Sequence, residues 1–241
     1  MDFLNKLIEF NNSLFYDEDK PIFCVIDGGI GSGKSTLLNR LRRIKQIGHR
    51  SVTIVDEPVD SWGELKDENG TPILELFYAN PTKYAFPFQM AAFISRFENL
   101  KKAMQANPQG IIISERSLYT DKMVFAKMLY DSGNIEHVNY SIYLKWFDVF
   151  AGQYPITKSI YIKTSPEICL ERIKQRGRLA EVNIELQYLE SCHDYHEKMM
   201  NTALSSCPCD DQLVLDGNID VTLNTHIFDD WIQQIKEFIA N

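Results

Sequence analysis

The sequence predicts a single α/β domain over residues 1–241, with three layers in which a five-stranded parallel sheet lies between helices. Apolar β-rich runs alternate along the chain with segments whose apolar residues recur at helical spacing. The runs show no alternation of polar and apolar residues, as expected for parallel strands covered by helices on both faces. The length of 241 residues is sufficient for one such domain with a substantial core. We therefore expect right-handed crossovers and a ligand site at the carboxyl ends of the strands.

The expected strands are five short apolar runs, which cover residues 22–27, 51–56, 110–115, 159–163 and 212–216. Helical spacing predicts helices over 34–46, 72–79, 87–106, 118–131, 137–153, 166–176, 185–204 and 221–239. Two prolines mark expected helix starts, because Pro87 and Pro166 each stand near the beginning of a helical pattern.

The most informative segment is the glycine-rich loop between the first expected strand and the first expected helix. It consists of Gly28, Gly29, Ile30, Gly31, Ser32, Gly33, Lys34, Ser35 and Thr36. A glycine, four residues and then Gly-Lys-Ser is the pattern of a phosphate-binding loop. A strand that enters a helix through glycines points backbone N–H groups and a helix N-terminus at one spot. Lys34 adds a positive charge and Ser35 offers a hydroxyl to Mg²⁺, so the loop predicts a nucleoside triphosphate site.

Carboxylates follow the second and the third expected strands, on the same side of the sheet as the phosphate loop. Glu57 could take the proton of a hydroxyl acceptor during phosphoryl transfer, or it is an exposed loop acid. Glu115 ends a strand of the Walker B type and could order Mg²⁺ directly or through water. Arg116 could neutralise oxygen charge near the acceptor. An ordinary ion pair at the strand end is the alternative for Glu115 and Arg116.

Three arginines near the end of the 166–176 helix form a basic cluster. Arg172 and Arg176 lie one helical turn apart, and Gly177 permits a break into a loop before Arg178. A mobile lid over about 176–185 would bring these charges to the transferring phosphate and exclude water. The alternative is a solvated basic helix end, which the helix dipole favours.

These motifs, in this order, resemble the deoxyribonucleoside kinases related to deoxycytidine, deoxyguanosine, deoxyadenosine and insect multisubstrate kinases. The resemblance runs from residue 22 to about residue 220. It implies a phosphate-loop kinase fold with an arginine-bearing lid, ATP as phosphate donor, Mg²⁺, and transfer to the 5′-hydroxyl of a deoxyribonucleoside in nucleotide salvage. The motifs that carry it are the phosphate loop, Glu57-Pro58 with Trp62, Gln89 to Arg96, Glu115-Arg116-Ser117, Leu118 to Asp121 with Phe125, Arg176-Gly177-Arg178, and Tyr188-Leu189-Glu190 followed by His193 and His196-Glu197.

The resemblance also implies a role for each residue around the transferred phosphate and the sugar. Glu57 resembles the base that receives the 5′-hydroxyl proton, and Arg116 the residue that holds this carboxylate and the 5′ oxygen. Tyr78 and Glu181 match positions that bind the 3′-hydroxyl, and Tyr78 would also crowd a ribose 2′-hydroxyl. The implied phosphate-binding and catalytic cations are Lys34, Arg172, Arg176 and Arg178, and the implied Mg²⁺ residues are Ser35 and Glu115.

The base is implied to bind between apolar walls and one amide. Gln89 matches the residue that pairs with the base edge, and its amide can both donate and accept a hydrogen bond. Trp62, Phe93 and Phe125 resemble the walls. An Arg–Asp pair at the positions of Arg96 and Asp121 accompanies deoxycytidine or purine preference in the family. We therefore expect these deoxynucleosides to be used better than thymidine.

Four positions depart from the pattern of the family and leave lid behaviour and exact specificity open. Gly29 stands where Asn is common, Lys122 where Arg is common, and Met199 where Trp is usual. Ala180 precedes the single acid Glu181, where the lid of relatives usually ends in two acids.

Two other readings of the phosphate loop stay open at this point. One is a nucleotide kinase or another small-molecule phosphate-loop kinase, whose phosphorylated acceptor would call for several dedicated basic groups. The other is a nucleotide-binding switch protein without kinase activity. An acceptor base and a sugar site argue against it.

Composition limits the partners and the location. The net charge of −8 disfavours nucleic acid as a partner, and no stretch approaches the length and apolarity of a membrane span. Residues 1–20 contain acids and no Arg, which argues against a mitochondrial presequence. Five scattered cysteines suit a reducing cytoplasm. By resemblance we also expect a homodimer and feedback inhibition by a deoxynucleoside triphosphate.

Overall fold

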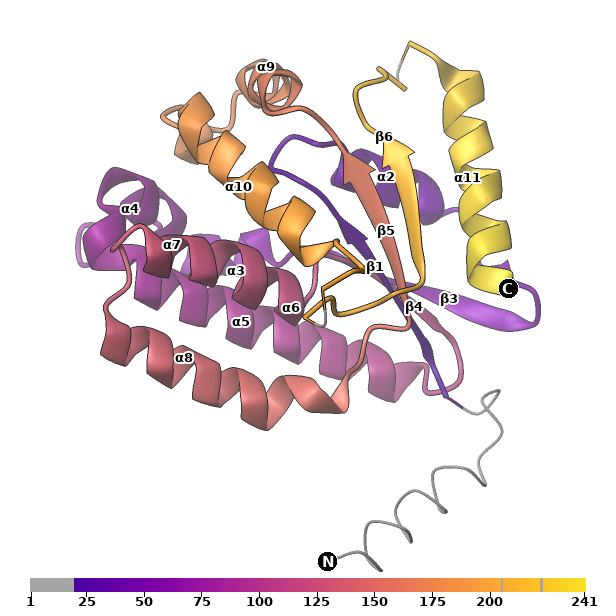
Figure 1. Ribbon diagram of the computed structural model, residues 1–241, viewed down its shortest axis with the longest axis horizontal. Helices are drawn as coiled ribbons and strands as arrows, with labels where there is room; N and C mark the ends of the chain where they lie inside the picture. The colour runs from indigo at the N-terminus through magenta and orange to yellow at the C-terminus, as the bar shows by residue number, and fades with distance from the viewer. Residues whose placement is uncertain (1–19, 205, 222) are drawn as a thin grey trace, which may run out of the picture.

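The computed structural model describes residues 20–204, 206–221 and 223–241, and its centre is a six-stranded sheet in the order β2-β3-β4-β1-β5-β6 (Figure 1). The five expected parallel strands are confirmed, and a two-residue antiparallel strand precedes β3 at one edge. The strands are β1 (Ile22–Asp27), β2 (Gln46–Ile47), β3 (Arg50–Val55), β4 (Ile111–Glu115), β5 (Lys158–Lys163) and β6 (Gln212–Asp216).

Helices cover both faces of this sheet, which gives the three predicted layers. The longer helices are α2 (Lys34–Leu41), α5 (Pro81–Ala106), α8 (His137–Phe150), α9 (Pro166–Arg176), α10 (Leu186–Met199) and α11 (Thr225–Ala240). The shorter ones are α3 (Val59–Glu64), α4 (Ile73–Ala79), α6 (Leu118–Thr120), α7 (Lys127–Asp131), the π-helical η2 (Asp121–Ala126) and the 3-10 turns η3 (Ala151–Gln153) and η4 (Leu179–Glu181).

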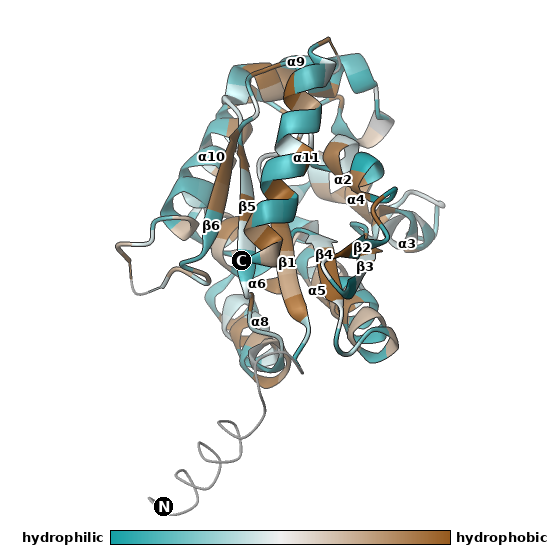
Figure 2. Cartoon of the chain, turned by 90° about the vertical axis from the view of Figure 1, so that its right-hand side faces the viewer, coloured by the Kyte–Doolittle hydropathy of each residue, from teal (hydrophilic) through white to brown (hydrophobic). Residues whose placement is uncertain are grey.

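Alternate side chains of β1 point to opposite faces of the sheet and belong to two different parts of the core. Cys24 and Ile26 pack with α2 and with Trp231 and Ile235 of α11 on one face. Phe23 packs with Leu100 of α5 on the other face. The central strand is therefore buried on both sides, which is why its sequence is continuously apolar. Figure 2 shows this as apolar strands beneath helices whose outer faces are polar.

Two wrong helix boundaries have a local cause, and a third helix has the expected bounds but is not α-helical throughout. The helix placed at 87–106 begins at Pro81, because Asn80 caps it by accepting from the backbone N–H of Lys83 at 3.2 Å, and Pro87 lies inside the helix. The helix placed at 34–46 ends at Leu41, since the chain turns into the β2–β3 hairpin. The helix placed at 118–131 is divided by a π-helical turn.

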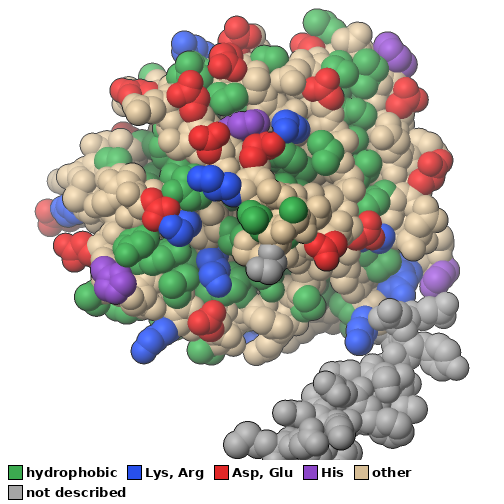
Figure 3. Space-filling view, viewed as in Figure 1, with side chains coloured by type: hydrophobic (Ala, Val, Ile, Leu, Met, Phe, Trp, Pro, Cys, Tyr) green, Lys and Arg blue, Asp and Glu red, His purple; other side chains and the backbone are tan. Residues whose placement is uncertain are grey.

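The helix placed at 185–204 also ends early, at Met199; the expected ends of other elements shift by up to four residues, and α3 was not predicted at all. Residues 1–19, for which the sequence argues against a mitochondrial presequence, lie outside the described residues. In the described part of the chain, no helix combines the length and the apolarity that a bilayer crossing requires. On the face drawn in Figure 3, acidic and basic side chains are interspersed, with apolar side chains between them.

Candidate active site

A cavity of about 520 Å³ opens at the carboxyl ends of the strands, where the sequence predicts the ligand site. It is continuous from the phosphate loop, past the ends of β3 and β4, to helices α4 and α5. Most of the predicted site residues line it, namely Ile30, Gly31, Ser32, Gly33, Lys34, Ser35, Thr36, Glu57, Trp62, Tyr78, Gln89, Arg96, Glu115, Arg116, Asp121, Phe125, Arg172, Arg176, Arg178 and Glu181. The predicted residues outside this lining are Gly28, Gly29 and Phe93.

The phosphate loop connects β1 to α2, and its glycines allow a close backbone path. Gly28 has φ +151°, and a Cβ on it would lie 2.7 Å from the carbonyl oxygen of Ile162. A Cβ on Gly31, at φ +82°, would lie 2.6 Å from the carbonyl oxygen of Cys169. Only glycine fits both positions, since a side chain would meet rigid backbone there. The loop therefore passes close to the backbone of β5 and α9.

Lys34 is buried at the start of α2, and its ammonium group folds back onto the loop. Nζ donates to the carbonyl oxygens of Gly28 and Gly29 at 3.1 and 2.7 Å. Burial, and next the charge of Arg116, lower the pKa of Lys34 to about 8. The helix N-terminus and this cation together form an anion site, as a triphosphate requires.

Ser35 and Glu115 meet at the floor of the cavity, although 80 positions separate them in the sequence. Ser35 Oγ lies 3.0 Å from each carboxylate oxygen of Glu115. A hydroxyl beside a carboxylate suits Mg²⁺, which keeps several waters and binds few protein oxygens together with phosphates. Among the residues described, no three His, Cys, Asp or Glu side chains gather as a complete protein cage for a metal. The fit is therefore to a metal that arrives with a triphosphate.

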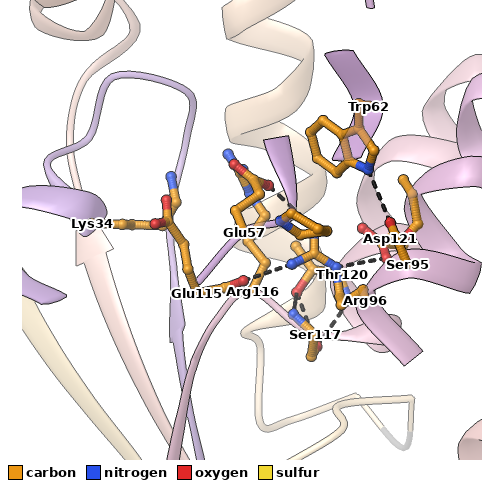
Figure 4. Close-up of polar contacts among 12 residues, drawn as sticks. Lys34, Glu57, Trp62, Ser95, Arg96, Glu115, Arg116, Ser117, Thr120 and Asp121 are labelled. Carbon is orange, nitrogen blue, oxygen red and sulfur yellow. Dashed lines mark hydrogen bonds and ion pairs between the residues drawn. The ribbon is translucent and has the colours of Figure 1, made fainter. Parts of the chain in front are cut away.

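Glu57 lies beyond the end of β3, and two arginines hold its carboxylate (Figure 4). Glu57 Oε1 accepts from Arg116 Nη1 and, at 3.1 Å, from Arg96 Nη2. Arg96 also donates to Asp121 Oδ2 at 2.8 Å and to the carbonyl oxygen of Glu115 at 2.6 Å. The arrangement is an ordered, buried network rather than the exposed loop acid of the alternative interpretation.

The charges of this network keep Glu57 ionised. Burial raises the pKa of Glu57, but Arg116, Arg96 and Lys34 together lower it to about 2. Arg116 has φ +61°, an unusual backbone conformation for a side chain other than glycine. The backbone N–H of Arg116 donates to the carbonyl oxygen of Ile26 at 3.0 Å. The guanidinium carbon of Arg116 lies 5.0 Å from the centre of the Phe125 ring. These contacts hold the guanidinium between Glu57 and Phe125.

The far end of the cavity is apolar apart from Gln89 and the buried Arg96–Asp121 pair. Gln89 is 2% exposed, and its Oε1 has no hydrogen-bond partner within the described protein. A buried acceptor without a partner is costly, so it is suited to a ligand donor. Trp62 is held by a hydrogen bond of 3.0 Å from Nε1 to Ser95 Oγ, and its ring meets Phe88 edge to face at 5.2 Å.

The lid arginines contact one carboxylate, and Arg172 contacts backbone. Glu181 accepts from Arg176 and, at 2.8 Å, from Arg178. Arg172 Nη1 donates to the carbonyl oxygen of Gly217 at 2.8 Å, so this guanidinium connects α9 to the segment after β6. Tyr78 lies in the same cavity, and burial, followed by the charge of Glu181, raises its pKa.

Comparison with known proteins decides the family, because the model of the deoxynucleoside kinase family matches residues 24–240. The chain belongs to the deoxynucleoside kinase family. The chain is 35% identical to a probable deoxycytidine kinase of fowlpox virus, over 82% of this chain and 78% of that protein. It is 31% identical to deoxycytidine kinase 2 of chicken, over 90% of this chain and 89% of the other. The chain is 29% identical to human deoxycytidine kinase, over 89% of this chain and 90% of that protein.

Membership of the deoxynucleoside kinase family confirms the resemblance drawn from the motifs and sets aside the nucleotide-switch reading. The protein is an enzyme, a deoxynucleoside kinase, and the family implies ATP as its phosphate donor. A mitochondrial deoxyguanosine kinase of Xenopus laevis is also similar, at 27% identity over 89% of this chain and 88% of that protein.

The aromatic residues that line the cavity differ in part from those expected. Phe93 is 1% exposed and packs against Phe97 and Tyr143, outside the lining of the cavity. Phe88 lines the cavity instead and stacks on Phe77 at 4.9 Å. The family resemblance implied Phe93 as a wall and did not include Phe88, which directly precedes Gln89. The rotation of α5 decides which ring faces the cavity.

Proposed function

We propose that this deoxynucleoside kinase transfers the γ-phosphoryl group of ATP to the 5′-hydroxyl of a deoxynucleoside, with Glu57 as the proton acceptor. The observation that carries the proposal is the placement of Glu57 between two arginines, in one cavity with the phosphate loop. Glu57 stays ionised with a pKa of about 2 and is therefore always ready to accept a proton. Its weak basicity is sufficient, because phosphoryl transfer depends mainly on positioning and charge stabilisation.

The remaining residues would position the two substrates. Lys34 and the loop N–H groups would bind the donor phosphates, and Arg116 would hold the 5′ oxygen next to Glu57. Arg176 and Arg178 would stabilise the transferring phosphate and exclude water. Mg²⁺ bound with the triphosphate would neutralise phosphate charge and would be held by Ser35 and Glu115.

We propose the deoxyribose site at Tyr78 and Glu181 and the base site at Gln89, Trp62 and Phe125, with Phe88 as an additional wall. The Arg96–Asp121 pair supports a preference for deoxycytidine or a purine deoxynucleoside. Both side chains are at most 3% exposed and lie beside the base end of the cavity. A charged pair there gives the methyl group of thymine no favourable contact.

The experiment that tests the function is an assay of phosphorylation of the four natural deoxynucleosides with ATP and Mg²⁺. We expect deoxycytidine or a purine deoxynucleoside to have the highest kcat/KM, and the product to be a 5′-monophosphate. ATP turnover that does not depend on the nucleoside would contradict the proposal. A nucleotide kinase would instead require deoxynucleoside monophosphates, and the two arginines nearest Glu57 are already paired with carboxylates.

We propose that the enzyme is a homodimer that associates through α8. Val138, Ile142, Trp146 and Val149 recur along one side of this helix and are 66%, 40%, 41% and 62% exposed. Such a stripe on the surface is typical of a protein interface. Sedimentation should give twice the mass of 27.9 kDa, and Val149→Asp should shift it towards the monomer. A wild-type monomer at micromolar concentration would contradict this proposal.

We propose that a deoxynucleoside triphosphate inhibits the enzyme by feedback. We also propose that the enzyme acts in nucleotide salvage in the cytoplasm. The inhibitor would span the continuous cavity, with its phosphates on the loop and its base near Gln89. Such an inhibitor should compete with both substrates. Inhibition kinetics with the triphosphate, in which ATP and the nucleoside are varied in turn, can test this. The five free cysteines support a reducing compartment.

A further inference from the structure

Glu181 in the lid is almost fully buried and holds two cations at once. Its side chain is 5% exposed, while those of Arg176 and Arg178 are 36% and 40% exposed. Arg176 Nη2 contacts Oε2, and Arg178 Nη1 lies 2.8 Å from Oε1. Both carboxylate oxygens are therefore engaged by guanidinium groups. The residue before Glu181 is Ala180, which supplies no second carboxylate.

In the proposed function, Glu181, Arg176 and Arg178 bind the substrates and not one another. Glu181 is to accept a hydrogen bond from the sugar 3′-hydroxyl, with Tyr78 beside it. The arginines are to contact the donor phosphates. Tyr78 remains protonated because burial and the charge of Glu181 raise its pKa, so its hydroxyl can donate to the 3′ oxygen. The pairs of Glu181 with Arg176 and Arg178 must therefore be exchanged when both substrates bind.

The exchange has an unequal cost in its two halves. An arginine that moves from Glu181 to a phosphate leaves a buried carboxylate short of a donor, which is unfavourable. The 3′-hydroxyl of a bound nucleoside supplies a replacement donor at the same carboxylate. The arginine therefore moves to the phosphate at lower cost when the nucleoside is already in place.

We propose that Glu181 couples the two substrates, so that the lid arginines engage the donor phosphates only when a nucleoside 3′-hydroxyl occupies Glu181. This coupling rests on the proposed function of the sugar site. In the absence of nucleoside, the arginines stay on Glu181, and transfer of the phosphoryl group to water is suppressed. The 3′-hydroxyl is thus a condition for donor engagement in addition to a binding contact.

The test is the affinity for the β,γ-imido analogue of ATP with Mg²⁺, measured by calorimetry on the full chain. Three states are compared: no nucleoside, a saturating concentration of the best deoxynucleoside, and a saturating concentration of its 3′-deoxy analogue. We expect the deoxynucleoside to tighten analogue binding by about 5-fold or more, within the usual range of coupling between sites. The 3′-deoxy analogue should tighten it by less than about 2-fold.

A matched pair of variants places the effect on Glu181. Glu181→Gln keeps the size of the side chain but removes its charge. No buried carboxylate is then left unpaired when an arginine moves, so the 3′-hydroxyl should no longer tighten binding of the ATP analogue. Glu185→Gln makes the same chemical change at an exposed position outside the cavity lining and should keep the wild-type response.

Equal tightening by the deoxynucleoside and its 3′-deoxy analogue would overturn the coupling, as would a full response in Glu181→Gln. The comparison of the two nucleosides needs no variant, so misfolding of Glu181→Gln would not remove the test. Either of these results alongside normal deoxynucleoside phosphorylation would refute only the coupling. Failure to phosphorylate any deoxynucleoside would refute the proposed function itself, and the coupling with it.

Discussion

Arg96 Nε lies 2.8 Å from Asp121 Oδ2, and both side chains are almost completely removed from solvent. The pair connects α5 to the first residue of the π-helical segment η2. The same guanidinium also contacts Glu57, so it joins the base end of the cavity to the proposed catalytic carboxylate. A change at this pair should therefore affect base selection and catalysis together.

The first prediction concerns base selection at this pair. Arg96→Met combined with Asp121→Ala should raise the kcat/KM for thymidine relative to that for deoxycytidine, because space and apolar contact replace a charged pair. Each single variant should be less stable to unfolding than the double variant, because removal of one partner of a buried ion pair costs about 3–5 kcal/mol. Competition assays with mixed nucleosides measure the ratio directly. A wild-type enzyme that prefers thymidine would refute the proposed preference.

The second prediction concerns the proton acceptor. Glu57→Gln should lower kcat by about 10²–10⁴-fold and leave nucleoside binding largely intact, because the amide keeps the shape but accepts no proton. Since the pKa of Glu57 is about 2, wild-type activity should show no loss attributable to this group between pH 7 and pH 5. Rapid-quench kinetics and nucleoside titration separate the two effects. Near-normal turnover in a folded variant would assign the base to another residue.

The third prediction concerns pH and the phosphate loop. The pKa of Lys34 is lowered to about 8 by burial and by Arg116, so the free enzyme loses this charge as the pH rises through 8. The kcat/KM for ATP should then fall by about tenfold per pH unit on the alkaline side. Arginine stays charged in this range, so Lys34→Arg should remove the alkaline fall even at a lower absolute rate. A flat profile from pH 7 to pH 9.5 in the wild type would contradict this role of Lys34.

The fourth prediction concerns the lid. Arg176→Ala should lower kcat and kcat/KM for ATP by similar factors, because the proposed contact forms with the transferring phosphate. The expected loss is about 10²-fold, comparable to the removal of one donor that stabilises transition-state charge. Arg40→Ala is a suitable control, since Arg40 pairs with Asp229 on the surface and lies outside the cavity lining. An increase in KM at unchanged kcat would instead indicate uniform binding of ATP by Arg176.

Local patterns were sufficient wherever a residue acts through its neighbours in the chain. The phosphate loop is an example, because its glycines, Lys34 and Ser35 are contiguous and the strand and helix around it have clear periodicity. The five parallel strands were also predictable, since burial on both faces leaves continuously apolar runs. The same local signals misplaced the start of α5, where Pro87 was preferred over the Asn80 cap.

Long-range packing decided the features that the sequence left open. The orientation of α5 turns Phe88, and not Phe93, towards the cavity, and no periodicity distinguishes these two aromatic residues on one helix. The left-handed conformation of Arg116 and the π-helical turn at Asp121 depend on contacts with other elements, such as the bond from Arg116 to Ile26. Propensity alone disfavours both conformations.

The sequence by itself determined a parallel α/β fold with a phosphate-loop motif, and its motifs together determined the kinase family. Those properties depend on contiguous residues whose chemistry is independent of the rest of the chain. Only the tertiary structure decided other polar contacts: the ion pair of Glu57 with Arg96, the hydrogen bond of Ser35 to Glu115, and the two ion pairs of Glu181 with the lid arginines. The physical reason is that Coulomb and hydrogen-bond energies depend on distance and burial, which the fold sets between residues far apart in the sequence.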